Sequence, residues 1–174
     1  MSVKARRGRI DLRELVLLAL LSALMFGTKV ALAAIPNVHL NAVFILLAVL
    51  LFGSRAFYAV FVYVLLEGVV YGFGLWFVSY LYAWPLLVLA ALPLRENRSW
   101  LLWAVLAAVH GLLFGALCAI PYFFVLSAKE AIAWWISGLP FDCIHAAANF
   151  VIVLTLLKPL YRVSLKALGR PREA

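Results

Sequence analysis

The hydrophobic pattern of this 174-residue chain consists of long apolar runs separated by short polar or helix-breaking stretches. A membrane-spanning helix needs about 20 mostly apolar residues, because each residue adds about 1.5 Å to its length. The second apolar run, residues 39–52, is short, so we expect it to tilt little, thin the bilayer locally or be partly re-entrant. The pattern predicts an all-α, polytopic membrane protein, one domain over residues 1–174 with six transmembrane helices at 12–35, 39–52, 56–73, 75–94, 100–120 and 139–158.

The stretch at residues 127–138 is the longest break between two of these runs. It contains Trp134 and Trp135, and tryptophan favours the membrane–water interface, where one side of the ring is wet. We therefore expect a short surface helix there, with Pro140 in the first turn of the sixth helix. A longer helix kinked at Pro140 is the alternative.

Composition and charge agree with a membrane protein. The chain is 68% hydrophobic and only 13% charged, which is more apolar surface than a soluble domain of this size can bury. Its net charge is +8, but the basic residues lie at the chain ends and in short loops. With both termini in the cytoplasm, every basic residue except Lys29 and Lys129 lies on the cytoplasmic side. The charge therefore indicates topology, and we expect no nucleic-acid partner.

Several polar side chains lie inside the apolar runs, where each costs several kcal/mol unless it is paired or wet. The helical rise places Lys29 and Asp142 about 24 Å from the cytoplasmic boundary, and Glu67 and His145 about 17–20 Å from it. We expect these groups to share a polar cavity in the outer half of the membrane. The alternatives are a structural Lys29–Glu67 ion pair and an Asp142 that only favours the first turn of its helix. His110 is expected to be neutral and bonded to a neighbouring helix.

Helical spacing adds aromatic residues to this predicted cavity. Trp76 and Tyr80 are four residues apart and lie on one helix face, which provides ring surfaces for a flat ligand. Trp84 and Tyr82 are expected to pack instead. Asp142, His145 and Asn149 share a face of the sixth helix, and the first outer loop is expected to close the cavity. The predicted substrate-binding residues are Lys29, Asn37, His39, Glu67, Tyr71, Trp76, Tyr80, Asp142, His145 and Asn149.

Catalytic and cofactor motifs are absent from the sequence. It contains no GxSxG turn, no HExxH pair and no GxxxxGK[ST] loop. Cys118 and Cys143 have no metal-type spacing. We therefore expect a protein that is not an enzyme, has no metal or cofactor, and does not hydrolyse ATP by itself.

A ridge of small residues follows the first predicted helix. Ala19-Leu20-Leu21-Ser22-Ala23 forms an AxxxA pattern that Gly27 and Ala31 extend, and such ridges let another helix approach closely. Together with the six spans and the run Gly138-Leu139-Pro140-Phe141-Asp142-Cys143-Ile144-His145, the chain resembles the substrate-binding S components of energy-coupling factor (ECF) vitamin transporters. The segments 35–40 and 66–74 are similar to members of that family as well, so the resemblance covers nearly the whole chain.

The resemblance implies a subunit of the bacterial or archaeal cell membrane that captures a vitamin or related micronutrient outside the cell. It also implies docking through Ala19, Ala23 and Gly27 onto a transmembrane T component that carries two ATPase subunits. The residues do not decide which vitamin is bound. Two other classes stay open: a stand-alone proton-coupled carrier that uses Glu67, Asp142 and His145 as a relay, and a structural or assembly protein whose polar residues only hold helices together.

Overall fold

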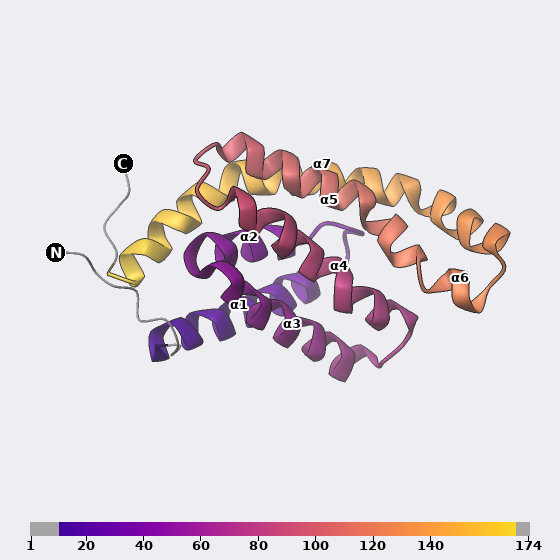
Figure 1. Ribbon diagram of the computed structural model, residues 1–174, viewed down its shortest axis with the longest axis horizontal. Helices are drawn as coiled ribbons and strands as arrows, with labels where there is room; N and C mark the ends of the chain where they lie inside the picture. The colour runs from indigo at the N-terminus through magenta and orange to yellow at the C-terminus, as the bar shows by residue number, and fades with distance from the viewer. Residues whose placement is uncertain (1–10, 170–174) are drawn as a thin grey trace.

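Helices form all the regular structure of the part of the chain that the computed structural model describes, residues 11–169. The prediction of an all-α protein is therefore confirmed for these residues. Most boundaries agree with the apolar runs to within four residues. The helices, shown in Figure 1, are α1 (Leu12–Ala31), α2 (Asn41–Phe52), η1 (Gly53–Arg55), α3 (Ala56–Tyr71), α4 (Leu75–Ala91), η2 (Leu92–Leu94), α5 (Trp100–Ala119), α6 (Tyr122–Val125) and α7 (Ala128–Ala167).

Large apolar side chains cover much of the outer surface of the bundle. Phe124, Val69 and Leu12 are 86%, 73% and 72% exposed, and exposed apolar patches of this kind need lipid or a partner to cover them. Within residues 11–169, five helical stretches are long and apolar enough to cross a membrane: 12–31, 41–71, 75–94, 100–125 and 128–167. The fold is that of a multi-pass membrane protein.

The stretch from Asn41 to Tyr71 is not one straight helix, because the chain reverses direction at η1. The side-chain amide of Asn41 donates a hydrogen bond of 2.7 Å to the hydroxyl of Tyr63. In a straight helix these residues would lie about 33 Å apart. Gly53 makes the turn possible, since its φ of 61° is a left-handed conformation that glycine adopts without strain.

Helix α2 is the centre of the bundle. All twelve of its residues are buried, and α1, α3, α4 and α7 pack around it. This position explains why its sequence is apolar on every face. Its length is only about 18 Å, whereas the hydrocarbon core of a bilayer is about 30 Å thick. The count of six complete crossings therefore stays a prediction.

Helices α1 and α3 lie side by side and run in the same direction. The hydroxyl of Ser22 donates a 2.9 Å hydrogen bond to the carbonyl of Ala59. Glu14, slightly more than two turns before Ser22, forms an ion pair with Arg55, which precedes Ala59 by about one turn. The parallel arrangement follows from the reversal at η1, because α2 returns the chain to the end at which α1 starts. Residues two turns beyond Ser22 and Ala59 are consequently neighbours as well.

The most extensive helix pair is α5 with α7, and glycines make the contact close. A Cβ atom added to Gly111 would lie 2.9 Å from the amide nitrogen of Asn149 and 3.0 Å from the backbone nitrogen of Ala146. One turn further on, a Cβ at Gly115 would overlap the carboxylate of Asp142. The sequence Gly-x-x-x-Gly is the pattern that lets membrane helices approach closely.

Helix α7 differs from the prediction of a separate surface helix at residues 127–138. It is one helix of 40 residues, which is the alternative that passes through Pro140. Ser127 is the N-cap residue of the helix, and its side chain and that of Glu130 form a reciprocal capping box. Pro140 removes one backbone hydrogen bond, and membrane helices tolerate such a loss where neighbouring helices pack against them. Trp134 stacks on Tyr122 of α6, with ring centroids 4.5 Å apart.

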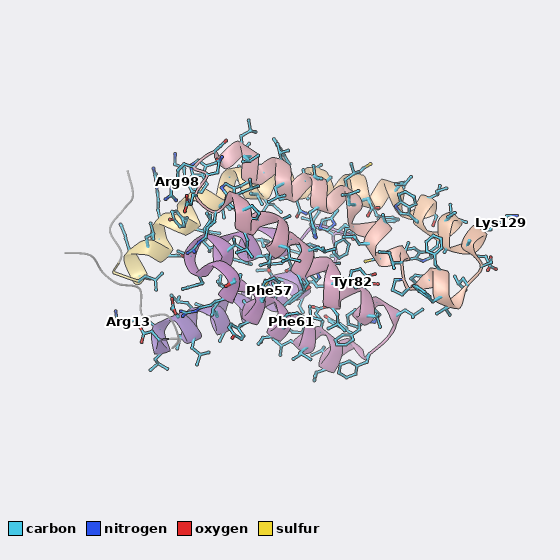
Figure 2. All side chains as sticks on the ribbon, viewed as in Figure 1. Arg13, Phe57, Phe61, Tyr82, Arg98 and Lys129 are labelled. Atoms are coloured by element: carbon cyan, nitrogen blue, oxygen red, sulfur yellow. The ribbon has the colours of Figure 1, made fainter. Side chains whose placement is uncertain are left out.

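The start of α1 and the end of α7 lie at the same end of the bundle (Figure 1). Figure 2 shows Arg13 and Arg98 at this end and Lys129 at the opposite end. Arg13 and Arg98, which were expected to share one side of the membrane, thus lie at the same end of the bundle. The basic residues expected on that side at positions 4–9, 170 and 172 lie outside the described residues. That this side is the cytoplasm remains a prediction from the positive-inside rule.

Cysteine labelling tests this orientation. Glu96 is exposed in the connection between η2 and α5, and Lys129 is exposed in the first turn of α7. After Cys118 and Cys143 are replaced by alanine, we expect Glu96→Cys to react with a membrane-impermeant maleimide only in inverted vesicles, and Lys129→Cys only in intact cells. The opposite pattern, or labelling of both from one side, would overturn the assignment of a cytoplasmic N-terminus.

Candidate functional site

A pocket of about 360 Å³ lies where α1, α3 and α4 meet the connection between α1 and α2. We call it the Lys29–Glu67 pocket. The connecting segment from Leu32 to Val38 forms one wall, and Phe114 of α5 contributes a further apolar surface. Of the ten predicted site residues, the ones that line the pocket are Lys29, Asn37, His39, Glu67, Tyr71, Trp76 and Tyr80.

Lys29 and Glu67 form an ion pair between α1 and α3. The parallel packing of these helices brings them together, because Lys29 follows Ser22 by two turns and Glu67 follows Ala59 by slightly more than two. The Glu67 side chain is completely buried, whereas the Lys29 side chain is 29% exposed. One carboxylate oxygen of Glu67 accepts from Lys29, and the other, Oε1, is buried without a hydrogen-bond partner among the described residues. An unsatisfied buried carboxylate oxygen is costly, so Oε1 is available to accept a hydrogen bond from a bound molecule or water.

Aromatic rings surround the ammonium group of Lys29. Its nitrogen lies 5.2 Å from the ring centroid of Tyr80 and 5.7 Å from that of Tyr71, within the range of cation–π attraction. Trp76 meets Tyr80 edge to face, with centroids 5.3 Å apart. These contacts place Trp76 and Tyr80, the two residues predicted to share a face of α4, at the pocket, where ring faces are available for a flat ligand.

Trp84 and Tyr82 of α4 pack, as predicted. Trp84 is fully buried behind the pocket. The hydroxyl of Tyr82 donates a 2.6 Å hydrogen bond to the carbonyl of Leu117 and so joins α4 to α5. His110 is also bonded to a neighbouring helix, as expected, since its Nε2 lies 2.9 Å from the carbonyl of Ala83.

The three histidines of the chain surround Trp84 below the pocket. The ring centroids of His39, His110 and His145 lie 5.5, 5.6 and 6.4 Å from that of Trp84. His39 and His145 are in direct contact, with centroids 4.7 Å apart. Within residues 11–169, no three His, Cys, Asp or Glu side chains are grouped so that they could hold a metal ion.

His39 lies between α1 and α2 and is the member of this cluster that lines the pocket. A neutral imidazole carries one donor and one acceptor nitrogen. The Nδ1 of His39 is buried without a partner among the described residues, so it is available to a bound molecule or water.

Asp142, His145 and Asn149 share the face of α7 that was predicted, but this face packs on α5 and does not line the pocket. Asp142 accepts a 3.0 Å hydrogen bond from the backbone N–H of Gly115, and Asn149 donates one of 3.3 Å to the carbonyl of Ala107. His145 alone reaches the pocket wall, through its contacts with His39 and Phe114. A role of Asp142, His145 and Asn149 in ligand binding stays a prediction.

Sequence reasoning expected the first outer loop to close the cavity, but it missed Phe114 and the apolar residues of the loop wall: Leu32, Ala33, Ile35, Pro36 and Val38. Phe114 lies one turn after His110 on α5, and this spacing was the signal that could have found it. The loop wall has no such signal, because its shape depends on where α2 begins.

Comparisons of the chain with models of known protein families, with curated proteins and with solved structures find no match.

Proposed function

We propose that this chain is the substrate-capturing membrane subunit of an ECF-type importer in a bacterial or archaeal cell membrane. It binds a vitamin or related micronutrient from outside the cell and delivers it with a T component and two ATPase subunits. The observation that carries this proposal is the Lys29–Glu67 pocket. Its volume of about 360 Å³ suits a small molecule, and its wall combines aromatic rings with a few oriented polar groups.

The surface of α1 supports the proposed partner. Ala19, Ala23 and Gly27 are all exposed and lie at intervals of four residues, so they form one stripe. A Cβ atom added at Gly27 would meet nothing within 4 Å, which places this stripe on the outside of the bundle. A smooth stripe of this kind allows another helix to approach closely. No ATP-binding loop occurs in the sequence, in agreement with ATPase subunits supplied by separate chains.

Mass spectrometry of small molecules released from the purified protein tests the proposal. We expect a molecule of vitamin size to co-purify with the wild type. Tyr80→Leu should retain roughly two- to tenfold less of it, because an aromatic contact contributes about 0.5–1.5 kcal/mol. Tyr58→Leu is the matched control, since Tyr58 is 58% exposed on α3 and does not line the pocket.

Mass spectrometry and an uptake assay also distinguish the proposed subunit from a structural protein and from a proton-coupled carrier. A structural or assembly protein would release no small molecule. A proton-coupled carrier would support proton-dependent uptake in vesicles that contain this chain alone, whereas the proposed subunit requires its ATPase partners. Either finding would replace the proposal.

A further inference from the structure

The two charges in the Lys29–Glu67 pocket are unequally accessible. The ammonium side chain of Lys29 is 29% exposed, whereas the carboxylate side chain of Glu67 has no exposed surface. A molecule that enters the pocket therefore meets the positive charge first. Because the interaction between charges weakens with distance, the nearer ammonium outweighs the carboxylate behind it.

The hydrogen-bond capacity of Lys29 is only partly used. A lysine ammonium has three N–H donors, and Glu67 Oε2 accepts one of them. Within the described residues the structure gives Lys29 no second hydrogen-bond acceptor; its remaining contacts are the rings of Tyr71 and Tyr80. The ring contacts and Glu67 hold the ammonium group at the wall of the pocket, within reach of a molecule bound there.

We propose that the Lys29–Glu67 pocket selects molecules that carry an anionic oxygen group, such as a carboxylate, on or near a flat ring. The anionic group binds the free donors of Lys29, and the ring lies against Trp76 and Tyr80. Glu67 lines the same pocket and acts as a positioning residue, because its Oε2 holds Lys29. This inference rests on the proposed function, because it names the chemical class that the same pocket binds.

Three probes with the same ring test the selection: pyridine-3-carboxylate, pyridine-3-carboxamide and 3-(aminomethyl)pyridine, which are anionic, neutral and cationic. Calorimetry on the purified full-length protein should rank them in that order of affinity. Lys29→Gln should weaken carboxylate binding by at least about tenfold, because it removes a charge-assisted hydrogen bond, and should bring the three affinities close together. Glu67→Gln should keep the preference for the carboxylate.

Lys129→Gln is the matched control, since it removes the same charge at the opposite end of α7 from the basic residues and should leave all three affinities unchanged. The ranking on the wild type needs no variant, so it stands even where a substitution impairs folding. Lys29→Arg, which keeps the charge, should keep the ranking.

Tightest binding of the cationic amine, or a carboxylate preference that survives Lys29→Gln, would overturn this inference and leave the small-molecule pocket in place. The same criterion applies to a molecule that co-purifies with the protein: an anionic one supports the inference, and a neutral or cationic one contradicts it. Absence of binding of all three probes, together with no co-purifying molecule, would remove the proposed function and this inference with it.

Discussion

Gly111→Leu is expected to destabilise the protein more than any surface substitution. The new Cβ would lie 3.0 Å from the backbone nitrogen of Ala146, and a backbone atom cannot rotate away as a side chain can. Helices α5 and α7 must then separate, and overpacking of this kind typically costs about 1–3 kcal/mol. The higher helix propensity of leucine offsets at most about 1 kcal/mol of that loss.

Gly138→Leu is the control for this experiment. Gly138 is also inside a long helix, but a Cβ atom there would meet nothing within 4 Å. Thermal unfolding of the purified variants, followed by the amount of protein that remains monodisperse, should show a lower melting temperature for Gly111→Leu alone. Equal melting temperatures for the two variants would mean that the close α5–α7 contact does not contribute to stability.

The Lys29–Glu67 pair could be predicted from the sequence because depth along a helix depends only on the number of residues. Both residues lie a similar distance from the end at which their helices start, and α1 and α3 start at the same end. Helical spacing likewise predicted that Trp76 and Tyr80 share a face. Short connections between helices leave little freedom in how neighbouring helices are arranged, so these estimates agree with the structure.

The direction in which a helix face points could not be obtained in the same way. Spacing shows that Asp142 and Asn149 share a face, but the neighbour of that face depends on packing. Gly111 and Gly115 leave a notch on α5, and the polar side chains of α7 occupy it. The Gly-x-x-x-Gly pattern was present in the sequence and was the available signal.

The length of α7 shows how two local signals compete. Pro140 favours a helix start, and this led to a predicted boundary near residue 139. The capping box of Ser127 and Glu130 favours an earlier start, and it satisfies two backbone donors at once. The earlier signal prevails because contacts with α5 and α6 compensate for the hydrogen bond that the proline lacks.

The double substitution Ala19→Leu and Ala23→Leu should separate ligand binding from transport. Both residues are exposed on α1, so leucine there leaves the Lys29–Glu67 pocket and the core of the bundle unchanged. A helix of the T component that approaches through the stripe would instead meet two bulky side chains. In cells that contain the complete transporter, we expect uptake to fall by at least about tenfold, which corresponds to about 1.4 kcal/mol of lost docking energy.

Ala90→Leu with Ala147→Leu provides the matched control, because these alanines are equally exposed but lie on α4 and α7. Calorimetry with the co-purifying molecule should give the same affinity for the wild type and for both double variants. A loss of uptake that is confined to the α1 variant, with unchanged binding, identifies α1 as the docking surface. An equal loss in the control, or normal uptake with leucine at both α1 positions, would show that the transporter partners bind elsewhere, because a close helix contact cannot accommodate two added leucine side chains.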